Sequence, residues 1–296
     1  MSDAKTTPGI LYVVATPIGN LEDMSPRATQ TLTHASLVAA EDTRTARRLL
    51  TRFDIRTPLT SYHEHNETRR VPQLVRRLLA GDDVAIVSDA GTPAISDPGF
   101  RIVRAALEAG IRVVPIPGPC AAIAALSAAG LPTDRFLFLG FLPPRKGRRR
   151  TLLESVRAEP GTLIMHESPH RILETLQDID QVLPGRDLVL ARELTKVHEE
   201  FLRGSPRWIS EQLSTDGGRR LKGEMTLLIA GAGHRTQPSA PECPPPDTGM
   251  KALARHVATS INAPTREVYQ ALQRLKDTRG RGQHALKQGK DPTSSA

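Results

Sequence analysis

The first 120 residues alternate between short apolar runs and segments with helical spacing, and this alternation constrains the fold more than any other feature. Ser25 and Pro26 form a helix start, while Gly81 and Gly110 are helix stops. Apolar runs typical of strands stand at 10–15, 36–40, 84–87 and 111–116, and helical segments at 26–35, 42–52, 71–81 and 100–110. Strands apolar on both faces, separated by amphipathic helices, are typical of a mainly parallel sheet covered on both sides. We therefore predict an α/β fold.

A second α/β unit and a helical tail follow. The stretch 136–150 begins apolar and ends in cations, and a helix follows it. Further strand-like or helical segments stand at 162–168, 169–176, 187–195 and 223–231. Five prolines mark a linker, and two helical segments follow it. The tail 247–296 carries nine Lys and Arg against four acids. The predicted organisation is a disordered start at 1–8, α/β subdomains at 9–122 and 123–231, a linker at 232–248 and a basic helical RNA-contact domain at 249–290.

The composition narrows the possible partners and compartments. The formal net charge of +8 favours a polyanionic partner. The two cysteines, Cys120 and Cys243, cannot form a disulfide framework or a metal cluster, which favours a reducing compartment. No signal-peptide pattern is visible, and the longest weakly polar stretch, 121–131, is shorter than the roughly 20 residues that a bilayer requires. We expect a cytoplasmic protein without a membrane anchor.

Loops rich in Gly and Pro follow the predicted parallel strands. The carboxyl ends of parallel strands meet at one edge of a sheet, where ligands bind. Gly and Pro allow a backbone to approach a ligand closely, and the helix start at 97–99 offers free N–H groups. Such loops suit a cofactor with a sulfonium, a carboxylate and a nucleoside better than a triphosphate. Neither a G-x-x-x-x-G-K-[ST] motif nor a G-x-G-x-x-G motif behind the first strand is present.

Seven motifs in fixed order carry a specific resemblance. They are ATPIGNLEDMSPRA, AEDTR, SYHEHNE, VSDAGTPAISDPG, PIPGPCAA, HESPHR and RELTKVHEEFLRG. Across residues 9–231 the chain resembles the bacterial 16S rRNA ribose methyltransferases, a branch of the tetrapyrrole methylase superfamily. The resemblance implies two α/β subdomains with S-adenosylmethionine in a cleft between them, and a homodimer. It also implies 2′-O-methylation, without a metal, of a cytidine in the decoding centre of 16S rRNA.

The resemblance also assigns cofactor residues to three loops. They are Pro17, Gly19, Ser88, Asp89, Ala90, Gly91, Thr92, Pro93, Ser96, Gly118, Cys120 and Ala121. Thr92 stands where relatives that methylate tetrapyrroles have an Asp, and the rRNA enzymes share this substitution. Ser88, Asp89 or Ser96 are the alternatives for the polar contact that this Asp would make.

Methyl transfer from a sulfonium requires the ribose hydroxyl to lie about 3 to 3.5 Å from the methyl carbon. A nearby base that accepts the hydroxyl proton then accelerates the reaction. The candidate catalytic residues are Glu167, Glu193 and Lys196, which follow predicted strands of the second α/β subdomain. The alternative for each is a structural ion pair. His63 and His65 alone make a weak metal site, so no metal is predicted.

Five cations stand in six positions at 145–150, beside two prolines and a glycine. We predict a loop that binds RNA phosphates; the alternative is a solvated surface. The predicted RNA-binding residues are Asp42, Arg44, His63, Arg145, Lys146, Arg148, Arg149, Arg150, Arg171, Arg192, Arg266 and Arg274. Arg171 and Arg192 could instead orient a carboxylate. Aromatic residues are 3% of the chain, which favours recognition by shape and backbone over base stacking.

Two other functions remain compatible with these residues. A methylase of a small tetrapyrrole-like metabolite would not need the basic segments. A non-catalytic ribosome-binding factor would keep cofactor binding without turnover on a small-subunit substrate.

Overall fold

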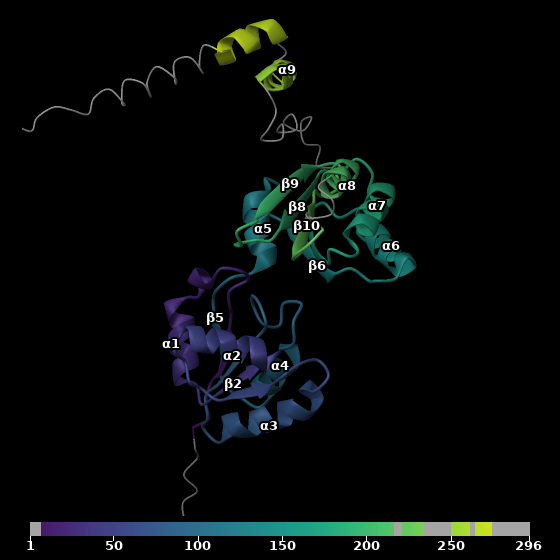
Figure 1. Cartoon of the computed structure of the whole chain (residues 1–296). Coiled ribbons are helices and arrows are strands. Elements are labelled where there is room, and N and C mark those ends of the chain that lie inside the picture. The colour runs from purple at the N-terminus through teal and green to yellow at the C-terminus, as the bar shows by residue number, and fades with distance from the viewer. Residues whose placement is uncertain (1–6, 216–220, 234–249, 261–263, 274–296) are drawn as a thin grey trace, which may run out of the picture. The chain divides into compact units, whose positions relative to one another are not determined.

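A computed structural model describes residues 7–215, 221–233, 250–260 and 264–273. The chain forms two compact units, Met1–His234 and Arg235–Ala296. The first unit contains two sheets, each with helices against it (Figure 1). We call the part from β1 to β5 the first subdomain and the part from α5 to β10 the second.

The first sheet is entirely parallel, as predicted. Its strands in spatial order are β3 (Leu59–Ser61), β2 (Leu37–Ala40), β4 (Val84–Val87), β1 (Leu11–Val14) and β5 (Val113–Ile116). The central strands β2 and β4 are buried on both faces, which explains their continuous apolar runs. Strand β3 was not predicted, because it is a half-buried edge strand of three residues, two of them polar.

Two pairs of helices cover this sheet. Residues of α1 (Pro26–His34) and α2 (Thr43–Arg52) pack on one face, and residues of α3 (Glu67–Leu79) and α4 (Phe100–Glu108) on the other. The Ser25 side chain caps α1 by accepting a hydrogen bond from Ala28 N at 3.1 Å, as predicted. Helix α3 begins four residues before the predicted start and includes Pro72, which is exposed. A short 3₁₀ helix, η1 (Leu21–Asp23), precedes α1.

The second sheet is mixed. Its strands in spatial order are β6 (Phe136–Phe141), β7 (Thr162–Glu167), β10 (Met225–Ile229), β8 (Leu188–Arg192) and β9 (Glu200–Gly204). Strands β6 and β7 are parallel, whereas β10 is antiparallel to both of its neighbours, and β9 to β8. Strands β6, β7 and β8 therefore run in the same direction, and their carboxyl ends share one edge.

Helix α5 (Ala121–Ala129) packs on one face of the second sheet through Ala122, Ala125 and Leu126. The other face carries α6 (Lys146–Ser155), α7 (Ile172–Val182) and α8 (Pro206–Ser214). The first sheet ends at Ile116, so the chain passes to the second subdomain slightly before the predicted boundary at 122.

The prediction that residues 145–150 form a loop is wrong. Residues 146–150 are the first half of α6. Arg149 and Leu153 lie one helical turn apart and are both fully buried, so the basic run contributes to the buried face of the helix.

The second unit contains α9 (Met250–Ser260) and a helix over residues 265–273. Ala254 and Ala258 pack against Val268, which confirms the predicted helix pair in its described part. Most of the predicted linker, residues 234–248, and Arg274 lie outside the described residues. Within the described ranges, no helix is long and apolar enough to cross a membrane.

Candidate functional site

Three of the predicted cofactor loops are joined by hydrogen bonds at the carboxyl edge of the first sheet. Thr16 and Gly91 form an antiparallel bridge, with Thr16 N donating to Gly91 O at 2.8 Å and Gly91 N to Thr16 O at 3.0 Å. The Thr92 hydroxyl donates to Pro119 O at 3.0 Å. The loops after β1, β4 and β5 therefore form one cluster, as the parallel topology predicted. Pro17, Ser88, Ala90, Pro93, Cys120 and Ala121 belong to the same loops.

Glycines allow these loops to approach one another. Gly91 has a φ of +82°, and a Cβ atom there would lie 3.3 Å from Ile18 Cγ2. A Cβ atom on Gly118 would lie 2.9 Å from Ala15 Cβ. Larger residues at these positions would therefore displace the loops.

Carboxylates gather at the same edge, which the sequence analysis missed. Asp89 Oδ1 accepts a hydrogen bond from Asp42 N at 3.1 Å. Burial and then the nearby charge of Glu41 raise the pKa of Asp97 to about 6, against a hydrogen bond from Ser88 that lowers it. Burial, followed by the charge of Asp89, also raises the pKa of Glu41. The region near Asp97 was expected to receive an anion, but these carboxylates favour a cation there.

Two of the predicted RNA-binding residues, Asp42 and Arg44, interact at the start of α2. Asp42 caps α2 by accepting a hydrogen bond from Arg44 N at 2.8 Å, and the Arg44 side chain lowers the pKa of this carboxyl to about 2. His63 follows β3 at the same sheet edge. RNA binding by Asp42, Arg44 and His63 stays a prediction.

Glu167 lies at the carboxyl end of β7 and is buried. Its Oε1 accepts hydrogen bonds from Ser168 N at 2.8 Å and Arg171 Nε at 2.9 Å, and its Oε2 accepts one from the Thr175 hydroxyl at 2.7 Å. Arg171 Nη1 donates to Leu142 O at 3.2 Å. This arrangement is the structural ion pair that the sequence left open, and it leaves the carboxylate no exposed oxygen for a substrate.

Glu193 and Lys196 form a second cluster after β8, together with Glu224. Lys196 Nζ lies 3.0 Å from Glu193 Oε1 and 3.3 Å from Glu224 Oε2, and Glu224 N donates to Glu193 Oε1 at 3.1 Å. Burial alone would raise the pKa of Glu193, but the hydrogen bonds from Lys196 and Glu224 lower it. Burial alone would lower the pKa of Lys196, but Glu193 and Glu224 raise it. At neutral pH both groups are therefore charged.

This second cluster meets the first-subdomain loops. A Cβ atom on Gly19 would lie 2.5 Å from Lys196 Cγ and 2.7 Å from Thr195 Oγ1. A Cβ atom on Gly140, near the end of β6, would lie 3.3 Å from Ser96 Oγ. Loops at the carboxyl ends of both sheets are thus in contact, and the predicted catalytic pair Glu193 and Lys196 adjoins the predicted cofactor residue Gly19.

Backbone strain concentrates in the same loops. Non-glycine residues with positive φ in the described chain include Ala94 at +70°, Ser96 at +64°, Glu193 at +50° and Thr195 at +65°. Each such conformation costs on the order of 1 kcal/mol or more and persists where surrounding structure enforces it, often at functional sites. The strain therefore supports placing the site at these loops.

Four of the predicted RNA-binding arginines form ion pairs with acids of the protein itself, which disfavours them as phosphate ligands. Arg149 and Asp178 are each 1% exposed, with Arg149 Nε donating to Asp178 Oδ2 at 2.7 Å. Arg192 is 8% exposed and pairs with Glu200 at 3.0 Å. Arg171 is held by Glu167, and Arg150 by Asp178 and Gln181. The guanidinium groups of these four arginines are paired with carboxylates of the protein. The side chains that remain exposed are Arg145, Lys146, Arg148 and Arg266.

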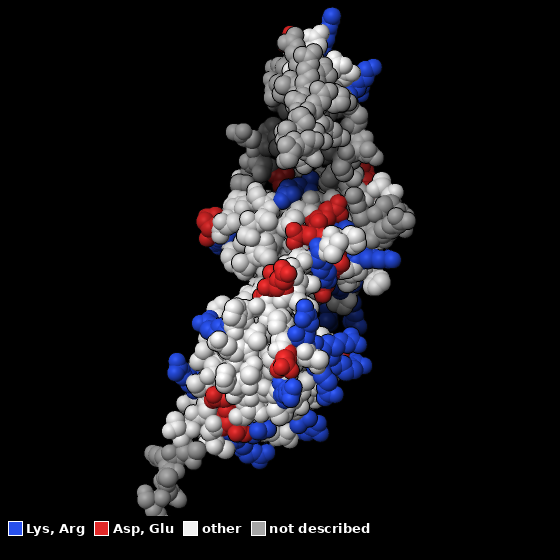
Figure 2. Space-filling view, turned by 60° about the vertical axis from the view of Figure 1, so that its left-hand side comes forward, with Lys and Arg blue, Asp and Glu red and all other residues white. Residues whose placement is uncertain are grey.

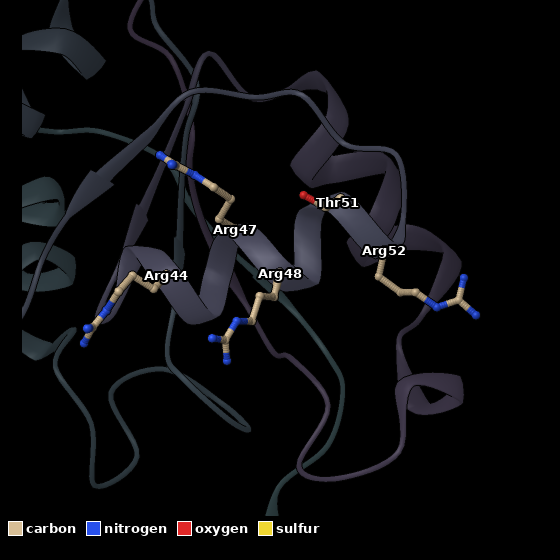
Figure 3. A pocket seen from close by; sticks show the side chains of 5 residues that line it. All are labelled: Arg44, Arg47, Arg48, Thr51 and Arg52. Carbon is tan, nitrogen blue, oxygen red and sulfur yellow. The ribbon is translucent and has the colours of Figure 1, made fainter.

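Helix α2 presents an arginine face that the sequence analysis did not single out. Arg44, Arg47, Arg48, Thr51 and Arg52 line an open hollow of about 520 Å³ (Figure 3). Within the described chain, no acidic side chain pairs with Arg47, Arg48 or Arg52. Cations also gather into patches on the face shown in Figure 2. The signal was present in TRTARRLLTR, whose arginines avoid the buried positions Ala46 and Leu50.

Among the residues that the structure describes, no group of three or more His, Cys, Asp or Glu side chains could hold a metal ion.

Comparisons with known proteins agree with this fold. Residues 10–207 match the Tetrapyrrole (Corrin/Porphyrin) Methylases. A ribosomal RNA small subunit methyltransferase I of Pseudomonas aeruginosa is 54% identical over 75% of this chain and 79% of its own length. One from Synechocystis is 47% identical over 88% of this chain and 96% of its own length.

Solved structures share the fold at low identity. Diphthine synthase has a TM-score of 0.60 at 14% identity, covering 75% of this chain and 90% of its own. Uroporphyrin-III C-methyltransferase from Thermus thermophilus, complexed with S-adenosylhomocysteine, has a TM-score of 0.52 at 18% identity. The match covers 75% of this chain and 97% of that enzyme's chain. The chain belongs to the tetrapyrrole methylase family and, within it, to the ribosomal RNA small subunit methyltransferase I family.

Proposed function

We propose that this protein transfers a methyl group from S-adenosylmethionine to the ribose 2′-hydroxyl of a cytidine in the decoding centre of 16S rRNA. The observation that carries the proposal is the contact between the Gly19 loop and the loop of Glu193 and Lys196. It joins predicted cofactor and catalytic residues in a chain whose curated relatives are small-subunit rRNA methyltransferases.

The residues present fit the cofactor. Gly91 and Gly118 allow the three loops to pack closely, since a Cβ atom on either would crowd Ile18 or Ala15. Glu41, Asp89 and Asp97 supply negative charge at the same edge, which suits a sulfonium cation. When bound, S-adenosylmethionine supplies an electrophilic methyl group. The loops after β1, β4 and β5 would hold it, with Thr92 fixed by Pro119.

In this proposal Glu193 accepts the proton from the ribose hydroxyl. Its Oε1 is occupied by Lys196 and Glu224, whereas its Oε2 has no hydrogen-bond partner in the described chain. Lys196 remains protonated and orients the carboxylate rather than serving as a base. Glu167 instead fixes the chain after β7 through Arg171 and Thr175.

RNA binding is assigned to exposed cations, because phosphate contacts dominate the affinity for nucleic acids. The arginine face of α2 and residues 145, 146 and 148 at the start of α6 are the candidates in the first unit. Arg266 is exposed on the helix over residues 265–273 in the second unit. A homodimer in the cytoplasm, acting on rRNA of the small ribosomal subunit, completes the proposal.

Mass spectrometry of 16S rRNA nucleosides tests the proposal. Cells lacking the gene should lose one ribose-methylated cytidine, and the wild-type gene should restore it. Gly91→Val should fail to restore it, because valine cannot adopt the φ of +82° without strain and would crowd Ile18. An unchanged nucleoside profile in the deletion strain would contradict the proposal. It would point instead to a metabolite methylase, or to a non-catalytic binder if purified protein binds S-adenosylmethionine without turnover.

A further inference from the structure

An aromatic cluster lies at the carboxyl ends of β6 and β7. The ring of His166 lies 5.2 Å from that of Phe138 and 5.5 Å from that of Phe141, measured between centroids. His166 Nδ1 lies 3.1 Å from the Thr226 hydroxyl, which fixes the imidazole. Burial lowers the pKa of His166, so the imidazole is neutral at neutral pH. The cluster is therefore a rigid, uncharged pair of rings behind Phe141.

The backbone turns Phe141 outward. The pairing of β6 with β7 shifts register between Phe138 and Phe141, and Gly140 between them has a φ of +63°. Irregularities of this kind redirect a side chain at the end of a strand and are frequent beside functional sites. Phe138 packs against the core of the second subdomain, whereas Phe141 is 58% exposed.

The exposed ring adjoins the candidate site. Its neighbour Gly140 approaches Ser96 of the strained loop after β4. The next carbonyl along the chain, Leu142 O, accepts a hydrogen bond from Arg171, which fixes the turn that follows. The exposed cations at 145, 146 and 148 follow within a few residues. Along the chain, the uncharged ring of Phe141 thus follows the contact with the loop after β4 and precedes a segment suited to phosphates.

We propose that Phe141, backed by His166, is a base-binding subsite on which a nucleobase of the substrate RNA stacks. The inference rests on the proposed function, since it supplies the contact that would hold one nucleotide near the methyl donor. RNA modules that bind unpaired nucleotides stack bases on aromatic side chains. The scarcity of aromatic residues argued against stacking as a general mode of recognition, but one exposed ring is enough for one base.

Substitutions at Phe141 test the subsite, with Phe136→Ala as the matched control. Phe136 is 43% exposed at the opposite end of the same strand. Phe141→Leu keeps an apolar side chain but removes the aromatic face, and Phe141→Trp restores a face. We expect Phe141→Leu to lower kcat/KM for methylation of small ribosomal subunits by roughly tenfold, in line with stacking energies. Phe141→Trp and Phe136→Ala should stay within about twofold of wild type, and calorimetric affinity for S-adenosylmethionine should not change.

A second readout does not depend on methyl transfer. A single-stranded RNA oligonucleotide containing 2-aminopurine should lose fluorescence on binding wild type and Phe141→Trp, but not Phe141→Leu. Equal quenching by wild type and Phe141→Leu, or no quenching by wild type, would overturn the subsite. A change of oligomeric state in Phe141→Leu by light scattering would also overturn it, since the ring would then be a contact with a second copy. Quenching without methylation by wild type would instead contradict the proposed function alone.

Discussion

Helices α2 and α6 are both ten residues long and rich in arginine, yet they use their arginines in opposite ways. On α6, Arg149 is buried and Arg150 is half-buried, and both pair with Asp178 of α7. On α2, Arg47, Arg48 and Arg52 line an open hollow and form no ion pair within the described chain. A dense run of cations in a sequence therefore does not identify the cations that are available to a partner.

The difference follows from helical periodicity. Arg149 lies one turn before Leu153, so it occupies the buried stripe of α6, where its partner Asp178 comes from α7. The buried positions of α2 are Ala46 and Leu50, and its arginines at 47, 48 and 52 lie off that stripe. An arginine on the buried stripe requires an internal acid, whereas arginines off the stripe remain in solvent.

Replacing Arg149 by Ala should produce the largest effect. Breaking a buried ion pair leaves Asp178 without one of its two arginine partners, so we expect the free energy of unfolding to fall by about 3 kcal/mol. Arg148→Ala, the exposed neighbour, should change it by less than about 0.5 kcal/mol. Urea titration followed by the fluorescence of Trp208, the single tryptophan, measures both. Equal stability of the two variants would remove the distinction between buried and exposed arginines on α6.

Charge reversal on α2 should have the next largest effect, on RNA rather than on folding. Arg47→Glu with Arg48→Glu should weaken binding to small-subunit rRNA roughly tenfold and reduce the slope of log affinity against log salt by about 2. The control is Arg69→Glu with Arg76→Glu, exposed residues of α3 on the other face of the first sheet. Filter binding at several salt concentrations distinguishes the pairs. If both pairs lower the slope equally, the hollow on α2 is not a specific RNA surface.

The sequence predicted those features that depend on local pattern. Apolar runs identified four of the five strands of the first sheet, and parallel order placed Gly19, Gly91 and Gly118 at one edge. The partners of buried charges could not be predicted in this way. Asp178 is 29 positions from Arg149, and the carboxylate of Glu167 is satisfied partly by Thr175 across the start of α7. The exposure of Phe141 depends on a register shift that no local pattern shows.

A comparison of two aspartates extends the contrast between the arginine helices. Burial alone would raise the pKa of Asp178, but Arg150 and Arg149 lower it. The pKa of Asp97 instead rises from an ordinary 3.8 to about 6, because burial and the charges of Glu41 and Asp89 act without an arginine to oppose them. Ionised Asp97 therefore costs the folded state free energy, whereas ionised Asp178 is stabilised by its partners.

Asp97→Asn should give the smallest effect, with a sign set by pH. Because the folded pKa of Asp97 lies above the unfolded one, its stabilising contribution is complete below about pH 4 and is lost as the pH rises through 6. At pH 7.5 the variant should be more stable than wild type by about 1 kcal/mol, a value reduced for a carboxyl that is only about half buried. Near pH 4 the two should be equal, since Asn can still accept the hydrogen bond from Ser88. Urea titrations at both pH values measure the difference, and a gain that is the same at pH 4 and pH 7.5 would show that Asp97 carries no uncompensated charge at this edge.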